Sequence, residues 1–404
     1  MHIVVGAGAA GCLVARRLSD AGHEVLLLEA GPGLPVPAAI ESPNWLRALA
    51  EPGWSWPDLV AKRVDTADKY WRGRGLGGST AINGLVALSG PIDDLVPWFG
   101  SIDDVAAARD LVLETLQPVT VRLGPLASAL GASPAPLTLR EGRRFSAADA
   151  YLAGASGELT VRAGAEVDRL VLVDHAVTGV RLIDGSVVAG EEVWICAGAI
   201  HSPVLLLRSG LTTPGIGDGL QDHIAARFIV DLPQGSGWSE AANEPPVTGL
   251  LTLTSEVDGG AVDDDVQILA MEHNGEPAQG IVLAAVMRIE STGFVGLTTD
   301  AKPHIDFNML DSAKDRERLA WVTHEAVRRL QDAGLSFAEA GLGDYVHAVG
   351  TCAVGSVVDA NGRVVGYDGI RVVDASILPQ VPRANTCVPT LIAAERVVAR
   401  VLGA

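Results

Sequence analysis

The sequence is short of cysteines and of basic residues, and both shortages exclude classes of protein. Its four cysteines, Cys12, Cys196, Cys352 and Cys387, show no C-x-x-C spacing and no Cys/His cluster. We therefore expect neither a disulfide framework nor a metal site. Lys and Arg number 30 against 49 Asp and Glu, and the net charge of −19 would repel nucleic acid and anionic membrane surfaces.

Long hydrophobic runs are also missing. No stretch of the 404 residues is apolar over the length that a membrane-spanning helix needs, so we expect no membrane span. The apolar residues at the N-terminus continue at once into a glycine turn, which indicates a strand of the fold rather than a signal peptide. We expect a cytoplasmic protein with two or three domains' worth of core.

The first motif that is present is a strand, a glycine turn and a helix. The N-terminal sequence reads HIVVGAGAAG, in which Gly6 allows a sharp turn, Gly8 a close approach of a pyrophosphate, and Gly11 tight packing of helix on sheet. Ala9 and Ala10 open the helix, whose N-terminus offers N–H groups and a positive dipole end to phosphates. The pattern predicts a dinucleotide site.

An acidic residue follows at the distance that this site needs. Glu29, followed by Ala30, ends the apolar run 25–28, where a carboxylate can bind the ribose hydroxyls of adenosine. An acid rather than a base disfavours the 2′-phosphate of NADP, so NAD and FAD remain. A second glycine-rich segment, 73–84, indicates backbone pressed against a flat or bulky group such as a flavin ring.

In the rest of the chain, the α/β pattern of the nucleotide-binding unit is interrupted by a segment that we expect to form an inserted second domain. We expect a short antiparallel meander over 159–182, a buried strand at 193–199, and a helix capped by Ser202 with Pro203 in its first turn. Residues 224–305 alternate apolar and polar in several runs, which predicts an antiparallel sheet with one wet face. Further helices are expected over 312–332 and 389–402.

Motifs spread over nearly the whole length, and in the same order, resemble those of the glucose-methanol-choline (GMC) oxidoreductases. Beyond the N-terminal motif they occupy 72–83, 198–211, 220–223, 303–308 and 347–390. The resemblance implies bound FAD and an α/β fold. A Rossmann-like FAD-binding domain would be discontinuous and would carry an inserted substrate domain of antiparallel β-sheet plus helices, a PHBH-like architecture.

The resemblance also divides the chain into two domains. We place the FAD-binding domain at 1–95, 141–222 and 345–404. The substrate-binding domain takes 96–140 and 223–344.

A catalytic pair is implied by the resemblance. His347 matches the family's active-site histidine, and Asn385 matches a second position that is His or Asn among relatives. A neutral imidazole can take the hydroxyl proton of an alcohol, and an amide can donate a hydrogen bond to the developing alkoxide. Without the flanking motif, His347 would read as a buried core histidine. His201 and His223 are expected to be structural.

The expected FAD contacts come from every segment of the nucleotide-binding domain. Asp374 matches an acid near the flavin in relatives, and Val167 begins the strand that meets the adenine. No histidine lies between residues 71 and 84, so the resemblance implies non-covalent FAD. The expected residues are Gly6, Gly8, Ala9, Ala10, Gly11, Glu29, Ala30, Arg74, Gly77, Gly78, Asn83, Val167, Ala197, Gly198, Asp374, Ala375, Asn385, Thr386 and Pro389.

The expected activity is FAD-dependent oxidation of a small-molecule alcohol to the carbonyl, with hydride transfer to flavin N5. The alternatives are a lyase of the same family without net redox, and a pathway-specific dehydrogenase with a protein, quinone or redox-peptide acceptor. An inactive FAD-binding module, and an NAD-dependent enzyme that gives the segment 73–84 no role, rank below them. The chain is short for the family between residues 31 and 71 and in the substrate domain. We therefore expect an open site, with oxygen, a quinone or another carrier as acceptor.

Overall fold

A parallel sheet of five strands forms the first layer of the fold. The computed structural model describes residues 1–155, 157–232, 244–257, 263–273, 275–276 and 278–403. The strand order is β21-β12-β1-β2-β8, and neighbouring strands pair in parallel. The strands span, in that order, Ile370–Val372, Glu192–Ile195, His2–Val5, Val25–Leu28 and Leu159–Arg162. β21, β12, β1 and β2 are almost wholly buried, as is usual where both faces of a parallel sheet are covered, whereas the edge strand β8 is largely exposed.

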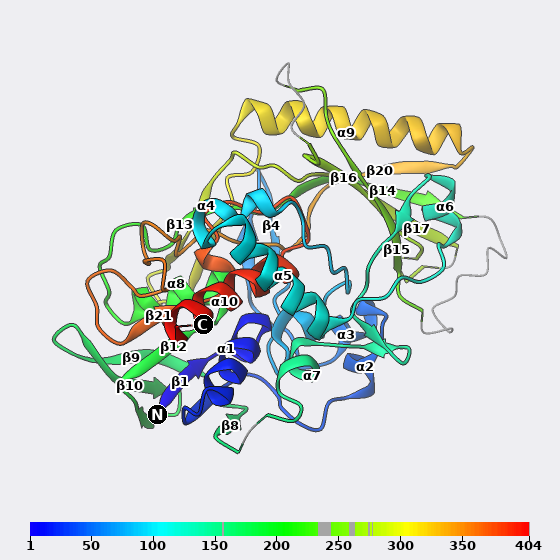
Figure 1. The fold of residues 1–404 in the computed structure, drawn as a ribbon. Coiled ribbons are helices and arrows are strands. Elements are labelled where there is room, and N and C mark those ends of the chain that lie inside the picture. The colour runs from blue at the N-terminus through cyan, green and yellow to red at the C-terminus, as the bar shows by residue number, and fades with distance from the viewer. Residues whose placement is uncertain (156, 233–243, 258–262, 274, 277, 404) are drawn as a thin grey trace.

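Helices from both ends of the chain cover this sheet. α1 (Ala9–Asp20) lies against β1 and β2 and packs with α10 (Cys387–Leu402). α5 (Ile102–Leu116) packs against α10 in turn, and the three helices lie together in Figure 1. A three-stranded antiparallel meander, β9 (Val167–Val173), β10 (Ala176–Leu182) and β11 (Val187–Ala189), contacts β12 through β10.

A second, antiparallel sheet of six strands carries the opposite end of the molecule. Its order is β20-β14-β17-β16-β15-β5. α9 (Ala313–Asp332), the long yellow helix of Figure 1, packs across β14, β16 and β17. The strands span, in that order, Phe337–Asp344, Ile224–Asp231, Gln279–Val286, Val266–Met271, Val247–Leu253 and Ser133–Pro134.

A third sheet connects the two ends, and it corrects the expectation of one sheet over 224–305. β18 (Gly293–Leu297) and β19 (Pro303–Asp306) join β13 (Asp218–Leu220), β3 (Val60–Lys62) and β4 (Ala67–Lys69). Of the runs that were expected to form one sheet over 224–305, only those from Ile224 to Val286 belong to the antiparallel sheet of six strands. β3 and β19 pair through Lys62 and Asp306, whose side chains also form a 2.9 Å ion pair.

Short elements fill the connections between the sheets. Among the described residues, no helix combines the length and hydropathy that crossing a bilayer requires. The short elements are α2 (Ala38–Glu41), α3 (Trp45–Ala50), η1 (Gly78–Ala81), η2 (Ile92–Asp94), α4 (Val96–Phe99), α6 (Pro125–Ala129), β6 (Leu139–Arg140), β7 (Arg143–Arg144), α7 (Ala147–Tyr151) and η5 (Ala375–Ile377).

The helix predicted from Ser202 begins four residues earlier. α8 spans Gly198–Arg208, so Pro203 lies inside it rather than in its first turn. Proline removes the N–H that would bond to the carbonyl of Ala199. The hydroxyl of Thr351 donates to that carbonyl instead, at 2.6 Å. A contact from a distant segment thus satisfies the acceptor that the proline leaves open.

The expected meander is also shorter than predicted, and the domain division cuts across packed elements. β8 pairs in parallel with β2 and leaves only β9 to β11 in the meander. α5 lies in the segment assigned to the substrate domain, yet it packs against α10. β18 and β19, also in the segment assigned to the substrate domain, belong to the same sheet as β3 of the FAD-binding domain. The boundaries stay a prediction, and these contacts show how closely the two parts interlock.

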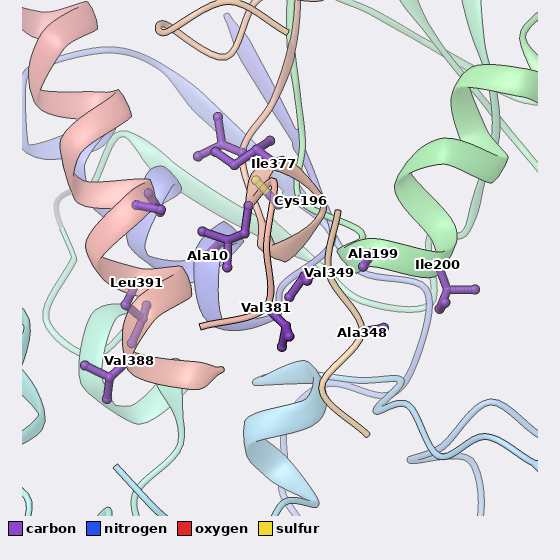
Figure 2. Packing of buried hydrophobic residues seen from close by; sticks show 14 of the residues in the cluster. Ala10, Cys196, Ala199, Ile200, Ala348, Val349, Ile377, Val381, Val388 and Leu391 are labelled. Carbon is purple, nitrogen blue, oxygen red and sulfur yellow. The ribbon is translucent and has the colours of Figure 1, made fainter. Parts of the chain in front are cut away.

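A continuous apolar core joins the layers beneath the site. Figure 2 shows Ala10 of α1, Cys196 after β12, Leu391 of α10 and Ile377 of η5, which belong to one buried cluster. Val349 lies in the same cluster, two residues beyond His347. The core therefore anchors the loops whose polar residues face the cavity.

Candidate active site and cofactor cleft

One large cavity runs from the parallel sheet to the six-stranded sheet. Its volume is about 1800 Å³, beyond the range of roughly 300–1,000 Å³ that is usual for small-molecule sites. Its walls include the glycine turn at Gly6, the segment 72–74, and the face of the six-stranded sheet around Leu283. The space suits an elongated dinucleotide together with a second, smaller molecule.

The end at α1 has the chemistry of a phosphate site. Gly8 precedes α1 without a side-chain capping bond, and the first turn holds no acidic residue. The first N–H groups of the helix are therefore available to an anion. A Cβ on Gly78 would lie 2.7 Å from the Cα of Gly8, so two backbone segments meet at this wall without side chains. These features fit the pyrophosphate of FAD.

Glu29 has three backbone partners. Its carboxylate accepts hydrogen bonds from the N–H groups of Ala7 (2.8 Å), Gly31 (2.9 Å) and Gly75 (2.8 Å). Burial raises the pKa of Glu29, and these three donors oppose that shift. The carboxylate thus holds the glycine turn, the end of β2 and the segment 72–75 together. Glu29 and Ala30 both line the cavity, and binding of ribose remains a prediction.

Asp374 plays the corresponding part on the other side of the cleft. Its carboxylate accepts from the N–H of Gly198 (2.8 Å) and the hydroxyl of Ser202 (2.5 Å), and from the N–H (2.8 Å) and hydroxyl (2.6 Å) of Ser376. Burial raises the pKa of Asp374. The start of α8 is thereby fixed beside Ala375, and Ala197, Gly198, Asp374 and Ala375 line the cavity.

Polar side chains reach the cavity between these two carboxylates. Arg74 forms a 3.1 Å ion pair with Glu166, next to Val167 at the start of β9. The amide oxygen of Asn83 accepts from the N–H of Leu85 (3.1 Å) and from Arg144 (2.8 Å). The amide N–H groups of Asn83 are then the part of its side chain left to bind a ligand.

Most, but not all, of the predicted cofactor residues line the cavity. The three outside it are Gly11, Gly77 and Pro389. A Cβ on Gly11 would lie 1.8 Å from the carbonyl oxygen of Gly6, so Gly11 serves helix packing, the role expected of it. Gly77 donates its N–H to Ala7 (2.8 Å), and Pro389 is buried in the first turn of α10. The predicted residues in the lining are Gly6, Gly8, Ala9, Ala10, Glu29, Ala30, Arg74, Gly78, Asn83, Val167, Ala197, Gly198, Asp374, Ala375, Asn385 and Thr386.

His347 and Asn385 both line this cavity. His347 follows β20, and Asn385 precedes α10, which begins at Cys387. The Oδ1 atom of Asn385 is buried and lacks a hydrogen-bond partner among the described residues. Burial, together with the nearby His223 and Arg72, lowers the pKa of His347 well below its ordinary value, so its imidazole is neutral at pH 7.

Two neighbours of His347 were not predicted from the sequence. Tyr345 lies two residues before it, with the ring centroids 5.4 Å apart, and its buried hydroxyl lacks a partner among the described residues. The Nδ1 atom of His223 lies 3.0 Å from Nδ1 of His347. The motif at 220–223 marked this segment, but only the tertiary fold brings it to the histidine.

Asp222 fixes the backbones of both histidines. One carboxylate oxygen, Oδ1, accepts from the N–H of His223 (2.7 Å) and of His347 (2.8 Å). The other oxygen accepts from the hydroxyl of Tyr70 at 2.7 Å, and that hydroxyl accepts from the N–H of Ala348 at 3.0 Å. Burial and the neighbouring Asp344 raise the pKa of Asp222.

The same three residues bring potential metal-ligating atoms together. One such atom each from Asp222, His223 and His347 lies within 4.8 Å of the others. Their hydrogen bonds account for this proximity. Both carboxylate oxygens already accept protein donors, and the 3.0 Å contact between the two Nδ1 atoms is a hydrogen-bond distance. We read the group as a hydrogen-bond network.

Among the cysteines, Cys196 and Cys387 line the cavity, whereas Cys352 is packed in the core. All four are free. Burial raises the pKa of the Cys387 thiol to about 12 and that of Cys196 well above its ordinary value. Both thiols are therefore protonated and weak nucleophiles near neutral pH.

The fold and the cavity define a Rossmann-like dinucleotide-binding protein with a second sheet facing the same cleft. Two family models described as "GMC oxidoreductase" match residues 127–225 and 290–394, and one described as "NAD(P)-binding Rossmann-like domain" matches residues 4–36. The chain belongs to the GMC oxidoreductase family. It is an oxidoreductase, and FAD is the cofactor that the family and the cleft indicate.

Curated relatives match over the full chain. The 5-(hydroxymethyl)furfural oxidase of Methylovorus sp. (strain MP688) is 28% identical over an alignment of 532 positions, with 99% of this chain and 98% of the relative covered. The oxygen-dependent choline dehydrogenase of Klebsiella pneumoniae (strain 342) is 27% identical, and the match covers 100% of this chain and 96% of the relative. Because this chain has 404 residues, it lacks segments that these relatives have.

Solved structures share the fold. The pyridoxine 4-oxidase from Mesorbium loti superposes with a TM-score of 0.83 at 24% identity, covering 99% of this chain and 98% of that one. The formate oxidase of Aspergillus oryzae RIB40, in a structure whose title refers to the effect of a mutation on FAD modification, superposes with a TM-score of 0.84 at 18% identity. The match covers 98% of this chain and 97% of that one.

Proposed function

We propose that this enzyme oxidises an alcohol to the carbonyl, with His347 as the general base and Asn385 as a hydrogen-bond partner of the alcohol oxygen. The observation that carries the proposal is that both side chains line the same cavity as the glycine-rich phosphate end. When bound, FAD supplies the acceptor for the hydride that leaves the carbinol carbon. The chain's own residues must then take the hydroxyl proton and orient the alcohol.

The protonation state of His347 supports the role of base. A neutral imidazole at pH 7 has a lone pair for the hydroxyl proton. Asn385 has a buried amide whose oxygen lacks a partner among the described residues. A hydrogen-bond donor of the bound cofactor would satisfy this oxygen, because an unpaired buried polar atom is costly, and the amide N–H of Asn385 is the group that can donate to the alcohol oxygen. Tyr345 adds an unpaired hydroxyl beside His347.

The wall opposite these polar groups favours an alcohol with an apolar body. Alternate positions of the six-stranded sheet face the cavity with aliphatic side chains. Two charged residues of this sheet also line the cavity: Arg227, an exposed residue within β14, and Asp344, the last residue of β20. The guanidinium of Arg227 donates to the carbonyl of Ala340. The aliphatic positions are Ile224, Val247, Leu269, Met271, Ile281 and Leu283.

FAD is proposed to be held without a covalent bond, because no histidine lies in the segment 71–84 that borders the cleft. The acceptor is proposed to be oxygen, a quinone or another carrier that reaches the site from outside. The length missing relative to the relatives supports an open approach. Release of yellow FAD on denaturation would support the first point, and protein that stays yellow after denaturation and washing would contradict it.

The test is an anaerobic absorbance titration of the purified yellow protein. A panel should contain aryl and alkyl primary alcohols, secondary alcohols, sugars and choline. Bleaching by the apolar alcohols, with the aldehyde formed in equal amount, supports the proposal. Turnover of a cyanohydrin without any bleaching would instead favour a lyase. Admitting air after bleaching then distinguishes an oxidase from a dehydrogenase by the rate at which the colour returns.

A further inference from the structure

The two histidines behind the alcohol site are linked by one short contact. Nδ1 of His223 lies 3.0 Å from Nδ1 of His347, and the two rings are perpendicular with centroids 5.2 Å apart. The other ring nitrogen of His223, Nε2, lies 3.0 Å from the carbonyl oxygen of Pro382. His223 is fully buried. Both of its ring nitrogens are therefore engaged by protein atoms.

The chemistry of these two contacts fixes where the protons lie. A carbonyl oxygen only accepts, so Nε2 of His223 carries a hydrogen and donates it to Pro382. A neutral imidazole has one N–H, so Nδ1 of His223 is an acceptor. Nδ1 of His347 must then be the donor of the 3.0 Å bond. Nε2 of His347 consequently keeps its lone pair.

The neutral state of both rings is consistent with their surroundings. Burial lowers the pKa of His223 to about 4, and burial, His223 and Arg72 lower that of His347. Arg72 donates to the carbonyl of Val346, next to His347. The titratable neighbours of the pair also include Asp222, which binds both backbone N–H groups, and Tyr345, whose ring edge meets both imidazoles.

The scaffold around the pair holds this arrangement rigidly. Asp222 places the two histidine backbones side by side. Gln221, one residue earlier, accepts the N–H of Val381 through its side-chain oxygen at 2.9 Å and thereby fixes the loop that presents Pro382. Its amide nitrogen donates to Ile289 at 3.2 Å. Three consecutive residues therefore position the acceptor, the backbones and the imidazole.

We propose that His223 is a positioning residue that holds His347 in the tautomer with the hydrogen on Nδ1 and the lone pair on Nε2. His347 lines the cavity, and because its Nδ1 is engaged by His223, Nε2 is the ring nitrogen left to receive the hydroxyl proton. The catalytic consequence rests on the proposed function, whereas the tautomer itself does not. The logic is that of a catalytic histidine whose second nitrogen is fixed by a buried partner.

The first experiment is ¹⁵N NMR of the FAD-loaded protein labelled at histidine, with a His347→Gln variant to assign the signal of His347. The expected result is a protonated Nδ1 and an unprotonated Nε2 in His347 at pH 7. A protonated Nε2 would overturn the proposal. Because this measurement uses the native protein without substrate, it stands even if no alcohol reduces the flavin.

Two variants test the consequence for catalysis. His223→Leu keeps the volume but removes the acceptor, whereas the side-chain oxygen of His223→Asn can still accept from His347. We expect the Leu variant to reduce flavin about 10- to 100-fold more slowly, with an unchanged KM. This loss is smaller than the roughly 10²–10⁴-fold that general base catalysis contributes, because the base itself is still present. The Asn variant should recover most of that loss. Equal losses in both, with the tautomer of His347 unchanged in the spectrum, would reduce His223 to a packing residue.

Discussion

The two ends of the cavity are built in different ways. At the parallel sheet, backbone groups form the wall, and the buried carboxylates of Glu29 and Asp374 tie separate segments together through their N–H groups. At the six-stranded sheet, the wall is a row of aliphatic side chains such as Leu269 and Leu283. One end is specified by backbone geometry and the other by side-chain volume.

This difference teaches where the chain can vary. A backbone wall needs glycine at defined positions and a buried acid to hold it, so few substitutions preserve it. A wall of aliphatic side chains accepts residues of similar volume at a cost usually below about 1.5 kcal/mol. Substrate preference can therefore change without loss of the cofactor site.

The largest effect is expected at Gly11, which lies outside the cavity lining and packs α1 against the glycine turn at Gly6. Gly11→Ala places a Cβ 1.8 Å from the carbonyl of Gly6, a clash that should cost more than the roughly 1–3 kcal/mol of ordinary overpacking and leave little folded protein. Its matched control is Gly8→Ala, because no atom of the described residues lies within 4 Å of that Cβ. Gly8→Ala should fold and lose FAD. Thermal melting and flavin content measure both, and a fully folded, yellow Gly11→Ala protein would refute the account.

The second effect is expected at the polar centre between the two ends. His347→Ala should slow anaerobic flavin reduction by about 10²–10⁴-fold, because no base then takes the hydroxyl proton. FAD content should not change, which separates this site from the backbone wall. His324→Ala, on the exposed side of α9, is the control and should reduce at the native rate. Undiminished reduction in the His347 variant would remove it from the mechanism.

The third effect concerns His223, which is buried beside His347. Its folded pKa is lowered to about 4, while the unfolded chain titrates near 6.5. Between these values the unfolded state takes up a proton that the folded state excludes, so stability falls as the pH falls from about 6.5 toward 4. Urea unfolding should show about 1.4 kcal/mol per pH unit from this residue. The same slope in His223→Asn as in the native protein would contradict the assignment.

The smallest effect is expected at the aliphatic wall. Leu283→Ala removes part of a half-buried side chain, worth about 1–2 kcal/mol of apolar contact. The KM for an apolar alcohol should rise about tenfold, while FAD content stays constant. Thr252→Ala, an exposed position of β15, serves as the control. A loss of FAD in the Leu283 variant would show that the two ends are not separable.

The sequence predicted the nucleotide-binding end well because its signals are local. The glycine turn, the helix after it and Glu29 occur within one strand-helix-strand unit, and the structure forms that unit. The helices over 312–332 and 389–402 begin within two residues of the predicted positions. The predicted start of α8 was wrong. Pro203 cannot donate a hydrogen bond to the carbonyl of Ala199, and Thr351, far along the chain, donates to it instead.

The sheet to which each strand belongs was less predictable, because alternation of apolar and polar residues indicates a strand but not the strand with which it pairs. β8 pairs in parallel with β2, and β18 and β19 join β3 rather than the six-stranded sheet. The candidate site shows the same limit. His347 and Asn385 were predicted from their motifs, whereas Tyr345 carried no signal and His223 was expected to be structural.

By itself, the sequence determined the dinucleotide-binding unit and the family, and it predicted the pair His347 and Asn385, because each inference depends on residue types within local motifs. Only the tertiary structure decided that Glu29 and Asp374 bind backbone groups, and that the two imidazoles meet at 3.0 Å. The physical reason is that buried hydrogen bonds are made by whichever groups the packed chain brings together. The two imidazoles, and Asp374 with Gly198, come from segments more than a hundred residues apart, and Glu29 binds N–H groups 22 and 46 residues away.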